Sequence, residues 1–393
     1  MMQGIMFQSH DFAFSHAPLT NEDKICAVAI SIVSSPGFNE IWNMISTCMP
    51  SEIYERISAN RSLSTQEFLT EIYSAKPREA AEEIMDWSAA KSMRVLSYWD
   101  DEYPPLLREI ERPPLVLYAR GDMETDHAIA VVGTRKADPR SAAHARRIAG
   151  DLASAGFTIV SGMAVGIDRA AHLGALDADG RTIGVLANGI DIAYPSVNRD
   201  LHRRIASSPG SGLISEYPPG IRGGKWAFSR RNRIISGICA GTVVVKAGKQ
   251  SGALITARHA VEQNREVFAC TGNSFDEEYA GCHELIRSGA VLVSRTEDII
   301  NELSRPFGSS GASGTERSGS GAKGAVSDPS PEEDPYEEGS LESRILLLVS
   351  KQDYEIDSVI RQVGASPAEV NEAIVELELC GRITRSGNII ARL

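Results

Sequence analysis

Between residues 127 and 270, short apolar stretches alternate with amphipathic ones, and glycine-containing turns separate them. The apolar stretches have the length of buried strands, and the amphipathic ones have helical spacing. This alternation is typical of parallel strands joined by crossover helices, because parallel neighbours need a long connection. The sequence therefore predicts an α/β fold with a doubly wound parallel Rossmann-like sheet. Its expected strands lie in HAIAVVG, FTIVSG, RTIGVLANG, GLISEYP, TVVVKAG and EVFACTG.

The turns after these strands contain residues suited to phosphate. Ligands of such sheets bind beyond the carboxyl ends of the strands, where small residues expose backbone N–H groups and helix N-termini favour anions. One glycine turn alone has a purely geometric explanation. Several at one sheet edge, together with an arginine, favour an anion-binding site, although GxGxxG and GxxxxGK[ST] patterns are absent. The candidate residues are Gly133, Thr134, Arg135, Ser161, Gly162 and Gly166.

A basic and aromatic segment, GGKWAFSRRNR, opens a later helix. Cations interleaved with aromatic rings suit single-stranded nucleic acid, because the cations contact phosphates while a ring stacks on an unpaired base. The candidates from this pattern are Lys225, Phe228, Arg230 and Arg233.

The same segment has a structural explanation, a buried arginine–carboxylate network with core aromatics. Arg230 and Arg233 are three residues apart and share a helix face, whereas Arg231 points elsewhere and is suited to pairing with an acid. The glycine-containing turns suited to phosphate are expected at the same sheet edge. Binding of nucleic acid is therefore favoured over a buried arginine–carboxylate network.

Catalytic chemistry is not evident. Asp168 and His172 are four residues apart on one helix face, as a capping or buried polar pair would be. No nucleophile with an adjacent base, no HExxH pattern and no paired carboxylates stand out. A structural role for His172 is favoured over that of a base. We therefore expect a protein that is not an enzyme and holds no cofactor and no metal.

Charge is unevenly distributed along the chain. The 393 residues carry a net charge of −12, which by itself argues against a nucleic-acid partner. Residues 126–304, however, hold 21 Lys and Arg against 18 Asp and Glu, so this part is at +3 and the remainder at −15. A local basic groove within an acidic chain still attracts phosphate.

Local sequence favours a cytoplasmic protein without membrane contact. No apolar run approaches the roughly 20 residues needed to span a bilayer, and the first residues lack the charged-then-apolar order of a signal peptide. The six cysteines are widely and irregularly spaced without a CxxC pair, which favours reduced thiols and argues against a zinc site.

The chain divides into segments of different composition. Residues 307–340 are rich in Gly, Ser and Pro and end in acidic residues, so they predict a flexible linker. Pro36-Gly37 is typical of a helix-hairpin-helix turn, but only one copy is present, and DNA binding by this region is not expected. The predicted parts are a small helical N-terminal domain (1–95), the Rossmann-like domain (96–305), the linker (306–340) and a winged-helix domain (341–393).

The tail predicts a winged helix because three helical patterns precede a hairpin that turns at Ser386-Gly387. Ser366, followed by Pro367 and Glu369, is a good helix start. The third helix of such folds often enters DNA. Here it is acidic, AEVNEAIVELE, which favours a protein-contact module over a DNA reader.

Taken together, these residues resemble the DprA/Smf family of DNA-processing proteins over nearly the whole chain. The lead-in at 95–122 is similar to the segment that precedes the family's Rossmann-like domain. The family's segments then follow in order as VVGTRKA, SGMAVGIDRAAH, VLANGIDIAYPSVNRDL, SEYPPG, FSRRNRIISG, SGALITARHAVEQNREVFA and LIRSGA.

The resemblance implies a non-catalytic protein that binds single-stranded DNA without sequence preference. It also implies DNA protection and loading of a RecA-type recombinase during natural transformation, and a homodimer formed through the Rossmann-like domain. Carried over by position, the family's DNA-binding residues correspond to Arg135, Ser161, Gly162, Gly166, Lys225, Phe228, Arg230, Asn232 and Arg233. The chain departs from the family at Lys246, where an acid is expected; a Lys246 side chain pointing into the pocket would strengthen phosphate contact.

Two other classes of protein were weighed. Nucleotide-cleaving phosphoribohydrolases have a similar topology and use a PGGxGTxxE loop with a catalytic glutamate. The corresponding stretch here, KAGKQSGALITARHAVE, lacks the double glycine after proline and a glutamate at the matching spacing. A pure protein-interaction scaffold is disfavoured by the alternation of cations and aromatic residues.

Overall fold

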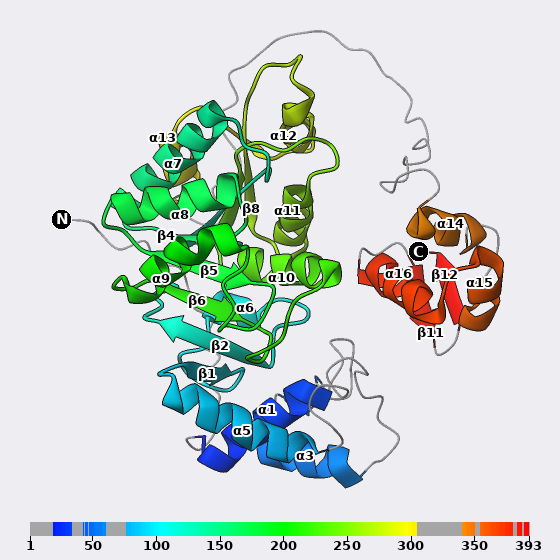
Figure 1. Cartoon of the computed structure of the whole chain (residues 1–393). Coiled ribbons are helices and arrows are strands. Elements are labelled where there is room, and N and C mark those ends of the chain that lie inside the picture. The colour runs from blue at the N-terminus through cyan, green and yellow to red at the C-terminus, as the bar shows by residue number, and fades with distance from the viewer. Residues whose placement is uncertain are drawn as a thin grey trace. The chain divides into compact units, whose positions relative to one another are not determined.

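The computed structural model describes residues 19–33, 42, 44–45, 47–59, 76–304, 340–349, 354–379, 383–386 and 389–392. They belong to two compact units, Met1–Arg305 and Pro306–Leu393 (Figure 1). The expected Pro36-Gly37 turn and, except for Ser340, the expected linker lie outside the described residues. None of the helices described is both long and apolar enough to cross a membrane.

Among the described residues, the first unit is built on a nine-stranded sheet with the order β1-β2-β6-β5-β4-β3-β7-β8-β9. The strands from β6 to β9 in this order are parallel, whereas β1 and β2 form an antiparallel edge. The predicted doubly wound sheet is therefore confirmed. The strands are β1 (Arg94–Ser97), β2 (Val116–Gly121), β3 (Ala128–Val132), β4 (Thr158–Ser161), β5 (Thr182–Leu186), β6 (Gly212–Ser215), β7 (Gly241–Val244), β8 (Glu266–Cys270) and β9 (Val291–Val293).

The strand order reverses beside β3. From β3 the chain proceeds outward through β4 and β5 to β6, and it then returns to β7 on the other side of β3. This reversal creates a topological switch point beside β3, and ligands of open α/β sheets bind beyond the carboxyl ends of the strands near such a point.

Helices cover both faces of the sheet (Figure 1). In β3, Ile129 and Val131 belong to the core beneath α7, α8 and α13, whereas Ala130 and Val132 belong to the core beneath α10, α11 and α12. Every residue of this strand is buried, which explains its continuous apolar sequence. The helices are α6 (Pro105–Arg108), α7 (Pro139–Ser154), α8 (Ile167–Asp177), α9 (Arg199–Ser207), α10 (Lys225–Gly237), α11 (Gly252–Glu262), α12 (Ala280–Arg287) and α13 (Thr296–Leu303).

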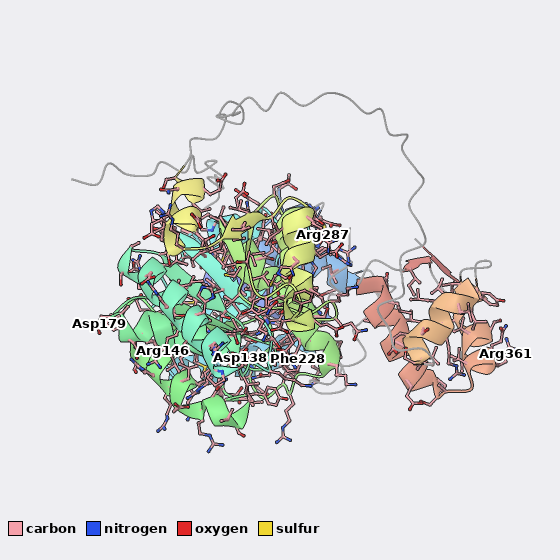
Figure 2. The ribbon with its side chains drawn as sticks, turned by 90° about the horizontal axis from the view of Figure 1, so that it is seen from above. Asp138, Arg146, Asp179, Phe228, Arg287 and Arg361 are labelled. Carbon is pink, nitrogen blue, oxygen red and sulfur yellow. The ribbon has the colours of Figure 1, made fainter. Side chains whose placement is uncertain are left out.

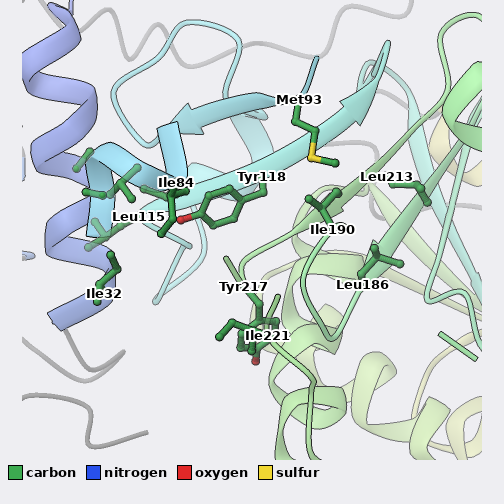
Figure 3. Close-up of a cluster of buried hydrophobic side chains, with 14 of the residues drawn as sticks. Ile32, Ile84, Met93, Leu115, Tyr118, Leu186, Ile190, Leu213, Tyr217 and Ile221 are labelled. Carbon is green, nitrogen blue, oxygen red and sulfur yellow. The ribbon is translucent and has the colours of Figure 1, made fainter. Parts of the chain in front are cut away.

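The N-terminal helices pack against the antiparallel edge of the sheet. They are α1 (Asn21–Val33), α3 (Pro50–Ala59) and α5 (Pro77–Ala90). Figure 3 shows Ile32 of α1 and Ile84 of α5 in one cluster with Tyr118 of β2, and the same core continues to Leu186 of β5. The helical segment and the sheet therefore share a hydrophobic core.

The second unit has the predicted winged-helix arrangement. Its helices surround a core that includes Ile345, Val359, Ile374 and Ile390. Ser366 and Glu369 form the expected helix start, since each accepts a hydrogen bond from the other's backbone N–H. The elements are α14 (Leu341–Val349), β10 (Tyr354–Glu355), α15 (Ile356–Val363), α16 (Pro367–Leu379), β11 (Ile383–Ser386) and β12 (Ile389–Arg392), with the sheet order β10-β12-β11.

Candidate nucleic-acid interface

The carboxyl ends of β3, β4 and β5 border a pocket at the edge of the sheet. Its volume is about 100 Å³, well below the roughly 300–1,000 Å³ of sites that enclose a drug-sized ligand. Such a space suits one part of an extended ligand better than a whole small molecule. The lining residues are Arg135, Gly162, Met163, Ala164, Val165, Leu186, Ala187, Asn188, Tyr194, Pro195 and Phe228.

A cation and two aromatic rings meet at this pocket. The guanidinium carbon of Arg135 lies 5.2 Å from the centre of the Phe228 ring. The Tyr194 ring lies 5.7 Å from the Phe228 ring, inclined at 47°. Arg135 is exposed, and Tyr194 is 54% exposed. This arrangement, the Arg135–Phe228–Tyr194 cluster, combines a solvent-facing cation with ring surface, as phosphate contact and base stacking require.

The pattern of α10 explains how Phe228 reaches the pocket. Ala227, Ile234 and Ile235 lie on one helix face and are buried against the sheet. Lys225, at the start of the helix, is therefore exposed, and Phe228 is half-buried at the pocket wall. No carboxylate in the described part of the chain forms an ion pair with Lys225, so its ammonium is available to an anion.

Several backbone and hydroxyl groups expected to face phosphate are bonded within the protein. The Thr134 N–H donates to the Lys246 carbonyl at 2.8 Å, and the Ser161 hydroxyl donates to the Val131 carbonyl at 2.7 Å. The Gly162 N–H donates to the Asp168 carboxylate at 3.1 Å. These groups hold the strand-end loops together.

The small residues of these loops permit close packing. Gly166 has a φ of +81°, and a side chain there would collide with the Thr134 and Arg135 carbonyls. A Cβ at Gly133 would lie 2.7 Å from the Ile167 side chain. The loops that end at Arg135 and begin α8 therefore fit together only with glycine at these positions.

Arg231 is buried beneath the pocket and has a structural role. Its guanidinium donates to the Gly162 carbonyl at 2.7 Å and to the Val185 carbonyl. Burial lowers the pKa of Arg231 to about 10, and the charge of Asp168 partly offsets this effect. Burial likewise raises the pKa of Asp168, against the influence of Arg231 and of backbone hydrogen bonds.

Arg230 and Arg233 are both paired with Glu216. The Arg230 guanidinium lies 3.0 Å from one Glu216 oxygen, and Arg233 binds the same oxygen. The Arg230 side chain is 13% exposed, that of Arg233 12% and that of Glu216 11%. Burial opposes ionisation of Glu216, but the two guanidinium groups hold its pKa below the ordinary value. The geometry is that of the buried arginine–carboxylate network, and these arginines lie outside the pocket lining.

Lys246 also lies outside the pocket lining and does not point into it. Its ammonium lies 2.6 Å from Glu278, 2.8 Å from Asp138 and 3.4 Å from Asp276, and its side chain is 4% exposed. Although burial opposes the charge, these carboxylates raise the pKa of Lys246 above its ordinary value. The acid expected after β7 is thus replaced by a cation that three neighbouring acids surround.

Asn232 contacts its own fold. Its side-chain oxygen accepts a hydrogen bond from Arg231 at 3.3 Å, and its amide donates to the Gly252 carbonyl at 3.4 Å.

Of the predicted site residues, the structure brings Arg135, Gly162 and Phe228 together at the pocket, with Lys225 on the same helix as Phe228. It gives Asn232 and the remaining predicted cations partners within the protein.

Two residues at the site were missed by the sequence analysis. Tyr194 supplies the second ring, and Asn198 donates to the Met163 and Ala164 carbonyls at 2.7 and 3.2 Å, which fixes the segment after Tyr194 against the pocket. An available signal was the aromatic residue in the loop after RTIGVLANG, since that loop lies at the same sheet edge.

His172 is a structural residue, as expected. It is fully buried, and its Nδ1 lies 2.7 Å from the Thr182 hydroxyl. Burial lowers the pKa of His172 to about 3, with a smaller contribution from the charge of Arg231, so the ring is neutral at physiological pH.

Comparisons with known proteins agree with this fold. The family model described as DNA recombination-mediator protein A matches residues 94–304, and the model described as DprA winged helix domain matches residues 329–388. Protein Smf of Synechocystis is 34% identical over 319 residues, which cover 75% of this chain and 79% of the relative. DNA processing protein DprA of Bacillus subtilis is 42% identical over 205 residues, covering 51% and 68% of the two chains.

The X-ray structure of DNA processing protein A from Streptococcus pneumoniae is similar in fold. It is 32% identical, with a TM-score of 0.59, and the match covers 72% of this chain and 98% of that one.

Proposed function

Because this chain belongs to the DNA recombination-mediator protein A family, we propose that it binds single-stranded DNA without sequence preference. In this proposal it shields the strand and delivers it to a RecA-type recombinase during DNA uptake or recombination. The protein acts by binding and performs no chemical step.

The Arg135–Phe228–Tyr194 cluster is the observation that carries this proposal. A cation that contacts phosphate beside rings that stack on bases is the usual combination in proteins that bind single strands. In a duplex the bases already stack on each other, so their faces are not available to a protein ring. Every base has such a face, which explains why this binding needs no particular sequence.

The predicted residues divide into two roles in this proposal. Arg135 and Lys225 contact phosphates, because their cations are exposed, and Phe228 contacts a base together with Tyr194. The others shape and hold the site through their internal bonds and close packing: Gly133, Thr134, Ser161, Gly162, Gly166, Arg230, Asn232, Arg233 and Lys246.

No observation in the described residues favours the nucleotide-cleaving alternative. The residues that line the pocket include neither a carboxylate nor a histidine. Hydrolysis of a glycosidic bond needs such groups to donate or accept a proton.

The test is fluorescence anisotropy of labelled oligo-dT and of a matched duplex at low and high salt. We expect preferential binding of oligo-dT that weakens with salt. Arg135→Ala should lower the slope of log affinity against log salt by about 0.7, the value of one phosphate contact on a single strand. Phe228→Ala should weaken binding by about 1–3 kcal/mol with little change in that slope, because a stacking contact is removed.

Arg147→Ala is the matched control, since Arg147 is an arginine of α7 whose side chain is 83% exposed. It should bind oligo-dT as the wild type does. Wild-type affinity in both Arg135→Ala and Phe228→Ala would refute the site. Equal affinity for duplex and single strand would refute the function.

The partners form a separate part of the proposal. The resemblance to the DprA/Smf family implies a homodimer and a RecA-type recombinase, and the acidic sequence of α16 suits a protein contact better than DNA. Light scattering of the full chain tests the dimer. Recombinase assembly on DNA coated with single-strand-binding protein, with and without this protein, tests the loading step.

A further inference from the structure

The pocket has two flanks, and they differ in charge. On the α7 flank, four cations, Lys136, Arg140, Lys246 and Lys249, accompany four carboxylates, Asp138, Asp276, Glu277 and Glu278. Their charges cancel. This flank adjoins the pocket because Lys136 and Asp138 closely follow Arg135, which lines the pocket; Figure 2 labels Asp138 and Phe228. A polyanion leaving the pocket gains little attraction in this direction.

The segment between Tyr194 and α9, here called the α9 flank, continues the ring surface of the pocket. Tyr194 is 54% exposed, and Val197 is 62% exposed. Asn198 bonds to the carbonyls of two pocket-lining residues, Met163 and Ala164, so this segment is held firmly beside the pocket. Exposed apolar and aromatic side chains on a fixed backbone offer contact surface to bases.

Two free arginines follow directly on this flank. Arg199 and Arg203 are exposed and one helical turn apart, so they share a face of α9. Leu201 and Ile205 are buried, which fixes the rotation of the helix and turns the arginines outward.

No acid is within ion-pair distance of either arginine in the part of the chain that the structure describes. The nearby Asp200 binds Arg169 at 3.0 Å, and Asp177 binds Arg204 at 3.0 Å. The pairing of these acids leaves the charges of Arg199 and Arg203 without an internal partner.

We propose that single-stranded DNA leaving the pocket runs along the α9 flank, where Arg199 and Arg203 contact its phosphates. This inference rests on the proposed function and extends it by giving the strand a direction. The α7 flank, where Lys246 is paired with acids and the four carboxylates equal the four cations in number, is not used. The site is thus longer than the pocket, and its outer part engages only strands that extend beyond the pocket.

The test compares oligo-dT of increasing length by anisotropy, using R199A/R203A in the full chain. The shortest oligonucleotide that binds should show wild-type affinity, whereas longer ones should bind several-fold more weakly. For long oligonucleotides, the slope of log affinity against log salt should fall by about 1.4, because two phosphate contacts on a single strand are lost. R199K/R203K should restore the slope, since a lysine also contacts phosphate.

The matched control is K136A/R140A, which removes two exposed cations from the α7 flank and should change neither affinity nor slope at any length. A length-dependent loss in this control, or wild-type behaviour of R199A/R203A with long strands, would overturn the proposal. Arg135→Ala separates the two hypotheses. If Arg135→Ala binds oligo-dT of every length with wild-type affinity, the pocket assignment is wrong. If Arg135→Ala weakens binding at every length while R199A/R203A binds as the wild type does, only the path along α9 is wrong.

Discussion

Three arginines of one helix, Arg230, Arg231 and Arg233, differ in environment although only three positions separate the first from the last. Arg231 donates to buried carbonyls, and the other two share Glu216. A guanidinium has five N–H donors and stays charged, so burial next to a core requires acceptors. Arg135, which has no acid partner in the described residues, retains a solvent-facing charge. Whether an arginine side chain remains available to a ligand therefore depends on nearby acceptors rather than on residue type.

Glu216→Gln should destabilise the protein by about 3–5 kcal/mol, because it leaves two largely buried guanidinium groups without their carboxylate. Urea unfolding followed by circular dichroism measures this change. Arg147→Ala, which breaks an exposed ion pair with Asp151, should cost less than about 1 kcal/mol. Equal stabilities of the two variants would contradict a structural role for the Glu216 network.

At the scale of elements, the loop after β3 and the start of α8 support each other. The Ile167 N–H, in the first turn of α8, donates to the Thr134 carbonyl at 3.2 Å. Gly166 lies between them with a positive φ and no room for a side chain. The position of Arg135 therefore depends on a glycine that belongs to a neighbouring element.

Gly166→Ala should cost about 1–3 kcal/mol in stability, because alanine is strained at this φ. It should also weaken binding of oligo-dT, since the collision displaces the loop that carries Arg135. Unfolding and anisotropy measure the two effects. The control is Gly252→Ala, where an added Cβ meets nothing within 4 Å and both properties should be preserved. Wild-type binding by a folded Gly166→Ala protein would argue against this coupling.

At the scale of the whole molecule, each unit has its own hydrophobic core. The cores that position the pocket are formed by residues of the first unit, and the winged-helix core is formed by residues of the second. Every residue of the Arg135–Phe228–Tyr194 cluster belongs to the first unit. Its geometry therefore does not need the second unit's core.

A chain that ends at residue 305 should fold and bind oligo-dT with an affinity close to that of the full chain. Because its cores remain complete, its cooperative unfolding should also persist. Circular dichroism and anisotropy check both points. A large loss of affinity in a folded truncated protein would show that the second unit contributes directly to DNA binding.

The order of elements could be predicted from local pattern alone. The strand at Ala128–Val132 is apolar throughout and lies between glycine-containing turns, and the start of the helix at Ser366 is a local pairing with Glu369. The convergence of Arg135, Gly162 and Phe228 was also predictable in outline, because the carboxyl ends of parallel strands share one edge. These features depend on neighbours in sequence and on the general geometry of the fold.

The sequence by itself therefore determined the doubly wound sheet, the winged helix and the edge where the site lies. Only the tertiary structure decided which cations remain free. Glu216 reaches Arg233 across 17 positions, and Asp138 reaches Lys246 across 108. A cation is neutralised by any carboxylate that tertiary packing places within a few ångströms of it. Packing brings together residues that no local sequence pattern connects.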